Sequence, residues 1–246
     1  VRMNAEIYMQ IKKILKSKKY SIGVGDEGGF APTFISNEEP FQIMSMAVAN
    51  AGYTLGKDVS FGIDAAATEF FKDNKYTLNK EGKSVTSDEL SSFLLSLSSK
   101  YPIISMEDIF AEDDWGAYQK FMTTSQGKIQ IVGDDLYVTN VKRLQKGIEE
   151  KSTNSILIKL NQIGTVSETI DAVLLARKNG MTSIISHRSG ETEDTFIADF
   201  VVALGTGQIK TGAPARSERT AKYNRLMRIE RGLGSRAVYA NLTLGK

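Results

Sequence analysis

Short apolar runs rich in β-branched residues alternate along the chain with segments of helical periodicity. Six of these runs are expected to form buried strands, at residues 59–63, 103–106, 129–132, 155–158, 182–185 and 208–211. Between them apolar residues recur every three or four positions, as in Leu90, Leu94 and Leu97, which predicts amphipathic helices. Two more helices are expected before the first strand, and a last one over residues 217–231.

Residues that begin helices support this interpretation. Three Ser or Thr residues precede a Glu by three positions, the spacing of a capping box: Ser36 with Glu39, Thr86 with Glu89 and Thr165 with Glu168. Six strand–helix units with apolar strands predict an α/β fold, a parallel sheet wrapped by helices. A (β/α)8-type barrel and an open doubly wound sheet both fit, and we favour the barrel. No linker interrupts residues 1–246, so we expect one domain.

The composition is that of an ordinary globular protein. The chain has 31 Lys and Arg against 29 Asp and Glu and is 41% hydrophobic, which excludes a disordered chain, a fibrous rod and a strongly basic nucleic-acid binder. The lack of cysteine excludes disulfides and thiolate metal sites and fits a reducing compartment such as the cytoplasm. No run approaches the roughly 20 apolar residues that span a bilayer, so no membrane insertion is expected. Because the chain opens on Val1 in an amphipathic segment, we expect the natural N-terminus to lie upstream.

Ionisable residues stand where the predicted strands end. In chain order they are Asp64, Glu107 with Asp108, Asp134 with Asp135, Lys159, His187 with Arg188, and Lys210. In a barrel the carboxyl ends of the strands meet at one mouth, where buried ionisable groups are costly unless they pair or bind a metal. Three consecutive strands end in carboxylates in a chain with one histidine. This pattern indicates an oxygen-ligand site for a hard cation such as Mg²⁺ rather than zinc.

Three further features each have a structural and a functional interpretation. Lys159, flanked by apolar residues, is either a general base or the partner of a buried ion pair. The run from His187 to Gly190 offers a guanidinium, a hydroxyl and a glycine that suit a phosphate or carboxylate, although a lone histidine is more often structural. The glycine-dense segment 23–32 holds Asp26 and Glu27, either in a simple turn or where backbone passes close to another group.

Several of these segments together resemble the enolase family. They are Gly25–Gly29, Ser105–Asp108 with Phe110–Trp115, Gly133–Leu136, Ile158–Thr165, Ser186–Thr192 and Gln208–Pro214. The resemblance covers almost the whole chain and implies the C-terminal barrel portion of an enolase. It also implies an α+β N-terminal domain and a first pair of barrel strands, which have no counterpart in these 246 residues. The family usually has a proline where this chain has Ile109.

The resemblance also implies a role for individual residues. They are the Mg²⁺ ligands Asp64, Glu107 and Asp134, the catalytic base Lys159, the catalytic acid Glu27, His187 in the wall of the catalytic site, and the substrate-binding residues Arg188, Ser189 and Lys210. Asp108 and Asp135 are then expected to point elsewhere. Burial should move the pKa of the catalytic acid up toward neutrality and, with the metal, the pKa of the base down.

The implied reaction is the Mg²⁺-dependent dehydration of 2-phospho-D-glycerate to phosphoenolpyruvate and water in glycolysis. Removal of a proton next to a carboxylate builds up charge that a cation must stabilise, which agrees with the carboxylate cluster. The resemblance also implies a homo-oligomer. The alternatives are a non-catalytic barrel acting as a binding or surface interaction protein, since fold does not fix function, and another lyase of the superfamily. The 246-residue chain alone is expected to be inactive and to shield unpaired strand edges by self-association or rearrangement.

Overall fold

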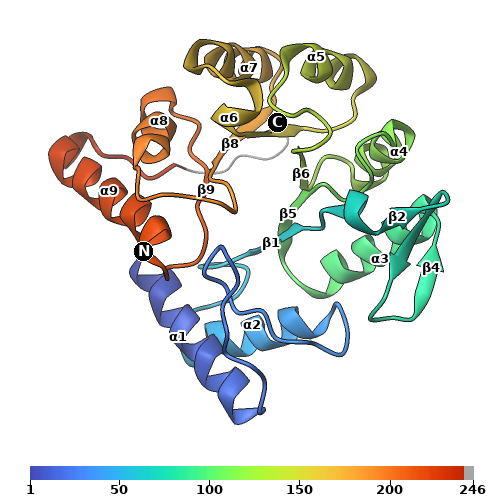
Figure 1. The fold of residues 1–246 in the computed structure, drawn as a ribbon, viewed down its shortest axis with the longest axis horizontal. Coiled ribbons are helices and arrows are strands. Elements are labelled where there is room, and N and C mark those ends of the chain that lie inside the picture. The colour runs from blue at the N-terminus through green and yellow to red at the C-terminus, as the bar shows by residue number, and fades with distance from the viewer. Residues whose placement is uncertain (241–246) are drawn as a thin grey trace. The chain divides into compact units, whose positions relative to one another are not determined.

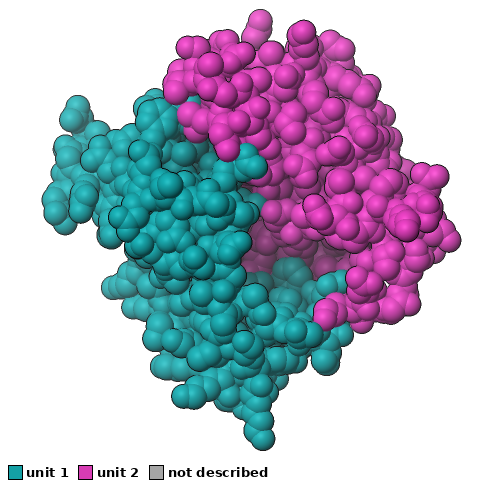
Figure 2. All heavy atoms as spheres, in the orientation of Figure 1, with its two compact units in different colours: residues 1–59, 185–242 teal, residues 60–184, 243–246 magenta. Residues whose placement is uncertain are grey.

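The computed structural model of the chain describes residues 1–240. Two compact units are present (Figure 2): unit 1 comprises residues 1–59 and the described residues from 185 onward, and unit 2 comprises residues 60–184. In unit 2 the fully buried side chains include Met106, Ile131 and Leu157, which belong to three neighbouring strands. In unit 1 the apolar core includes Leu15 and Ile43. Each unit therefore has a core of its own.

Parallel strands alternate with helices along the chain (Figure 1). In unit 2 the strands β1 Phe61–Asp64, β5 Ile103–Glu107, β6 Gln130–Gly133 and β7 Ser155–Ile158 lie in that order and pair in parallel. The next strand in the order, β8 Thr182–Ser186, begins in unit 2 and ends in unit 1. There it pairs in parallel with β9 Ile209–Lys210. All six strands expected from the sequence are present, each within two residues of the predicted bounds.

The helices also follow the predicted pattern. In unit 2 they are α3 Ser87–Lys100, α4 Trp115–Ser125, α5 Val141–Glu150, α6 Leu160–Ile163 and α7 Val166–Lys178, with the 3-10 turn η1 Ala67–Phe70. In unit 1 they are α1 Arg2–Ser17, α2 Glu39–Asn50, α8 Phe196–Leu204 and α9 Ser217–Leu233, with the 3-10 turn η2 Gly234–Arg236. The sequence does not predict α6, because a single turn is too short to show helical periodicity. No helix in the described part of the chain is long and apolar enough to cross a membrane.

Two of the three predicted capping residues begin helices. Thr86 caps α3, since its hydroxyl accepts the N–H of Glu89 at 3.3 Å while the Glu89 carboxylate accepts the N–H of Thr86 at 2.8 Å. Thr165 caps α7 through its hydroxyl, which accepts the N–H of Glu168 at 3.2 Å. The third prediction is wrong as a cap: Ser36 accepts the N–H of Glu39 at 3.2 Å, but α2 begins only at Glu39.

A three-stranded antiparallel sheet between β1 and α3 is absent from the sequence prediction. It consists of β2 Phe71–Lys72, β3 Lys75–Leu78 and β4 Lys83–Val85. Asp73 and Asn74 join β2 to β3 with positive φ angles of 52° and 58°, as in a two-residue hairpin turn. These strands are short and polar, so they contain no apolar run of the kind that marks the buried parallel strands.

Candidate functional site

Strand register places three carboxylates on one face of the sheet in unit 2. Asp64 of β1 pairs with Glu107 of β5, and Glu107 pairs in turn with Val132 of β6. Because side chains alternate between the two faces of a strand, Asp134, two residues beyond Val132, faces the same way as Glu107. Glu107 and Asp134 are buried and Asp64 is exposed. In the described residues the carboxylate oxygens that lie within 4.8 Å of one another belong to Asp108, Asp134 and Asp135, so a joint site of Asp64, Glu107 and Asp134 stays a prediction.

Lys159 contacts Asp134 from the end of the next strand. It follows β7 directly in an extended conformation, with φ −124° and ψ 107°, and its Nζ forms an ion pair with Oδ2 of Asp134. The other carboxylate oxygen of Asp134 accepts a hydrogen bond from Nε2 of Gln162 at 3.0 Å. The Lys159 side chain is only 15% exposed. The ion pair that the sequence left open as an alternative to a base role is therefore present.

Asp108 and Asp135 do not point away from this site, contrary to the sequence expectation. Asp108, Asp134 and Asp135 each offer one carboxylate oxygen to a group in which these atoms lie within 4.8 Å of one another. Asp108 has a positive φ of 42°, and its carboxylate accepts the backbone N–H groups of Asp134 and Asp135, each at 2.8 Å. The left-handed turn directs the side chain toward the loop after β6, which regular strand alternation does not predict.

Burial and the closeness of like charges raise the pKa of two of these acids, Asp108 and Asp135. Burial raises the pKa of Asp108 to about 7; the charges of Asp134 and Asp135 add to the increase, and the two backbone N–H groups oppose it. Burial and the charge of Asp134 also raise the pKa of Asp135. A cation bound among such groups relieves the repulsion between like charges. Clustered oxygen donors without nitrogen or sulfur ligands fit a hard divalent cation such as Mg²⁺.

In unit 1 the glycine-dense segment forms a tight turn that carries Glu27. The N–H of Gly25 donates to the carbonyl of Gly29 at 2.8 Å, and the N–H of Gly28 donates to the carbonyl of Gly25 at 3.0 Å. Gly28 has a φ of 80°, and a Cβ atom there would lie 2.7 Å from the carbonyl oxygen of Ala215. Both interpretations of the segment hold, because it is a turn and another backbone segment passes close to it.

His187, which follows β8, lies against Glu27. The imidazole is buried, with Nε2 at 3.3 Å from Oε2 of Glu27 in an arrangement poorly aligned for a hydrogen bond. The contact with His187 lowers the pKa of Glu27 to about 2; partial burial opposes the decrease, and the charges of Lys210 and Arg219 add to it. The expectation that burial raises the pKa of this acid is therefore wrong, since the neighbouring donor and positive charges outweigh burial.

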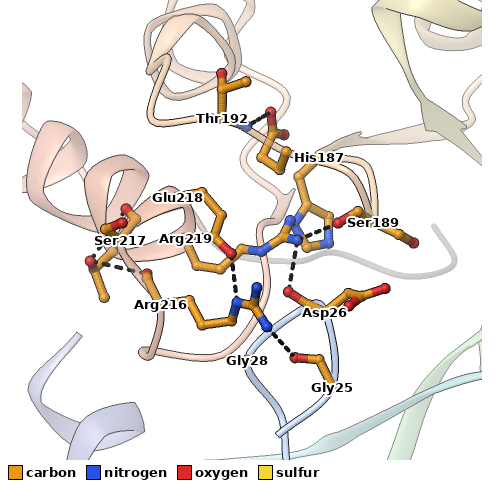
Figure 3. A network of polar contacts seen from close by, with 12 residues as sticks. Gly25, Asp26, Gly28, His187, Ser189, Thr192, Arg216, Ser217, Glu218 and Arg219 are labelled. Atoms are coloured by element: carbon orange, nitrogen blue, oxygen red, sulfur yellow. Dashed lines mark hydrogen bonds and ion pairs between the residues drawn. The ribbon is translucent and has the colours of Figure 1, made fainter.

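The residues predicted to bind phosphate follow His187. Arg188 and Ser189 are exposed, while their backbone carbonyls each accept a hydrogen bond from the guanidinium of Arg219 at 2.7 Å. Lys210, at the end of β9, pairs with Ser186 of β8. Figure 3 shows the Arg219 guanidinium between the loop of Asp26 and the loop after His187. Unit 1 thus gathers a carboxylate, an imidazole and basic groups that can bind an anion and transfer a proton.

Comparison with known proteins identifies the family. The family model for the enolase C-terminal TIM barrel domain matches residues 1–246. The chain belongs to the enolase family. It is 54% identical over 240 residues to Enolase 1 of Methanospirillum hungatei JF-1, and the match covers 98% of this chain and 56% of that relative. The chain therefore spans little more than half the length of the curated enolase that it matches.

Membership of the enolase family settles the choice between the two sheet architectures that the sequence left open. The α/β fold is that of an enolase C-terminal TIM barrel domain, so the barrel prediction is confirmed. Among the predicted residues, the structure brings Lys159 into contact with Asp134 in unit 2 and His187 into contact with Glu27 in unit 1.

Two residues that the sequence does not single out support these contacts. Gln162 donates to Asp134, and Arg219 contacts His187. Gln162 lies in the unpredicted helix α6, close after Lys159, which is the only sequence signal for it. Arg219 is one of several charged residues of α9, and no spacing distinguishes it from the solvated ones. Only its burial reveals it.

Proposed function

We propose that the protein carrying this chain is an enolase that dehydrates 2-phospho-D-glycerate to phosphoenolpyruvate and water with Mg²⁺. One observation carries the proposal: the Lys159 amine contacts Asp134 on the sheet face that strand register gives to Glu107 and Asp64. An amine beside clustered carboxylates suits the removal of a proton adjacent to a substrate carboxylate. The match of the enolase family along the whole chain supports the choice of reaction.

Asp64, Glu107 and Asp134 would hold Mg²⁺ in this proposal. When bound, the cation would stabilise the negative charge that builds on the substrate carboxylate as the C2 proton leaves. The amine of Lys159 contacts Oδ2 of Asp134, so it competes with a cation for that oxygen. We therefore expect Lys159 to turn from Asp134 toward the substrate in the loaded site.

Lys159 and Glu27 would divide the two proton transfers. Lys159 takes the proton from C2, and the electron pair of the C–H bond moves into the substrate carboxylate. Glu27 then gives a proton to the C3 hydroxyl, which leaves as water while the C2–C3 double bond forms. Because the pKa of Glu27 is about 2 in the structure, this carboxylate has to take up a proton before it acts. An anionic substrate nearby raises that pKa and favours the uptake.

Arg188, Ser189 and Lys210 would bind the substrate. A guanidinium offers parallel N–H donors to phosphate oxygens, and a serine hydroxyl adds one more donor. Arg188 and Ser189 are exposed at the end of β8, where a phosphate can reach them. We further propose that the protein is a cytoplasmic homo-oligomer that acts on this small-molecule substrate, with no nucleic-acid partner and no insertion into membranes.

The proposal is tested by assaying the complete purified protein for conversion of 2-phosphoglycerate to phosphoenolpyruvate. Turnover should require Mg²⁺, so that a chelator abolishes it and added Mg²⁺ restores it. Lys159→Ala should fold, as judged by circular dichroism, and lose turnover. A folded parent protein that binds Mg²⁺ but does not turn over the substrate would contradict the proposal and favour a non-catalytic barrel acting as a binding or surface interaction protein.

The proposed activity is that of a protein with the length of the matched enolase, of which this chain covers 56%. The family resemblance implies that a glutamine, a glutamate and a serine-bearing loop outside these residues also contribute to the site. We therefore expect the 246-residue chain alone to have negligible activity. Turnover by the isolated chain at the rate of a full-length enolase would contradict this expectation.

A further inference from the structure

Helix α9 carries two basic side chains that are buried. Arg219 and Lys222, three residues apart on the helix, are 0% and 1% exposed. Lys222 donates through Nζ to the backbone carbonyls of Thr192 and Glu218. Lys222 also pairs with the carboxylate of Glu191 at 3.7 Å, in the loop after His187, whereas Arg219 contacts His187 itself and the loop of Asp26. The helix therefore provides two buried cations that are matched in position and burial but differ in their neighbours.

The guanidinium of Arg219 joins two segments of the candidate site (Figure 3). One terminal nitrogen lies 2.6 Å from Nδ1 of His187 and donates to the carbonyl of Arg188 at 2.7 Å. The other donates to the carbonyl of Asp26 at 3.0 Å and to that of Ser189 at 2.7 Å. No carboxylate is among these four partners. A buried charge without a carboxylate partner is costly. If this position served only apolar packing, an uncharged side chain would be more stable there.

The contact with Arg219 determines the tautomer of His187. A guanidinium has N–H donors and no acceptor, so Nδ1 of His187 must offer its lone pair to the nitrogen 2.6 Å away. In the neutral ring the proton is then on Nε2, the atom that lies 3.3 Å from Oε2 of Glu27. The opposite tautomer would direct two N–H groups at each other and turn a lone pair toward a carboxylate.

We propose that Arg219 is a positioning residue, which fixes His187 as the Nε2–H tautomer facing Glu27 and holds the loops of Asp26 and Ser189 in one arrangement. Arg219 acts through these groups and need not touch the substrate. The effect on kcat that we expect from the loss of Arg219 rests on the proposed enolase function. The tautomer of His187 does not rest on it, so the two can fail separately.

The tautomer is tested by ¹⁵N NMR of histidine in the complete parent protein. His187 is the only histidine of this chain, and a His187→Asn variant identifies its signals if the complete protein holds others. We expect Nδ1 to resonate as an unprotonated nitrogen and Nε2 to carry the proton. A proton on Nδ1 overturns the proposal without any Arg219 variant, so the test does not depend on whether such a variant folds.

The positioning role is tested with two variants of Arg219 and with a matched control, Lys222→Met. Arg219→Met should abolish the preference for the Nε2–H tautomer and lower kcat about 10²-fold with a smaller change in KM, because small displacements of reacting groups cost about that much. Arg219→Lys should restore the tautomer, because its amine can donate to Nδ1. Lys222→Met removes the other buried cation of α9 and should leave the tautomer unchanged. An unaltered tautomer in Arg219→Met, or the same loss in Lys222→Met, overturns the proposal.

Discussion

The carboxylate of Asp108 accepts the backbone N–H of Asp134 at 2.8 Å, so that one acid of the cluster in unit 2 holds another in place. Asp108 does so from a left-handed conformation, with a φ of 42°. A positive φ at a residue other than glycine stores strain, which the two hydrogen bonds to the Asp108 carboxylate can offset. The position of Asp134, and with it the contact to Lys159, therefore depends on the side chain of Asp108.

Replacement of Asp108 by asparagine should loosen this arrangement. The amide keeps one acceptor oxygen and turns an N–H₂ group toward a backbone N–H, which leaves a buried donor unpaired. We expect a loss of about 1–3 kcal/mol in the free energy of unfolding, measured by urea denaturation. Affinity for Mg²⁺, measured by calorimetry, should fall by about 10–100-fold, as is typical when a group that orients a metal ligand is lost.

The control for this substitution is Asp113→Asn, which neutralises an exposed acid of the loop after β5. It should change neither the stability nor the Mg²⁺ affinity measurably. Equal Mg²⁺ affinities for Asp108→Asn and the parent protein would show that Asp108 does not position the acidic site.

The low pKa of Glu27 leads to a prediction about pH. Its folded-state pKa is about 2 against an ordinary value of 4.5, so the ionised carboxylate contributes stability that is present above 4.5 and is lost as the pH falls toward 2. The difference in unfolding free energy between the parent protein and Glu27→Gln should therefore be constant near neutral pH and shrink on acidification through 4.5. Urea denaturation at a series of pH values measures it. A difference that grows on acidification would show that the pKa of Glu27 is raised rather than lowered.

Tyr76 should anchor the antiparallel sheet of unit 2. The side chain is completely buried, and its hydroxyl donates to Asp114 at 2.9 Å and accepts the N–H of Ala111 at 2.9 Å. Tyr76→Phe leaves the buried N–H of Ala111 unpaired, while Asp114 keeps the hydrogen bond from the Ser87 hydroxyl at 2.7 Å. We therefore expect the substitution to lower the free energy of unfolding by about 1–3 kcal/mol. Tyr239→Phe, at a side chain that is 93% exposed, is the control and should have no effect. Equal stabilities of the two variants would contradict this role for Tyr76.

The sequence predicts the parallel strands because each is a short apolar run, as in Ile156 to Ile158, where all three side chains are fully buried. It does not predict β2, β3 and β4, because they are polar and their turn depends on positive φ angles at Asp73 and Asn74. Periodicity reports which residues are buried against a neighbouring layer. The strands of a short hairpin contain too few buried residues to show such a periodicity.

The candidate site, like the fold, can be predicted from the sequence only in part. Glu107, Asp134 and Lys159 can be predicted, because the ends of neighbouring parallel strands lie at one edge of a sheet. The role of Asp108 depends on a left-handed backbone angle, and that of Arg219 on which loops meet the buried face of α9. The pKa of Glu27 depends on His187, a residue 160 positions away, since the two come together only in the folded chain.

The exchange of the C2 proton of 2-phosphoglycerate with deuterated solvent tests the central claim most directly, because it reports proton removal separately from loss of the hydroxyl. The complete parent protein with Mg²⁺ should exchange this proton. Lys159→Ala should lose the exchange by up to about 10⁴-fold, the contribution of a general base. It should still bind Mg²⁺ by calorimetry, since Asp134 is then released from its ion pair. Exchange by Lys159→Ala at the parent rate would show that another group removes the proton and would contradict the account.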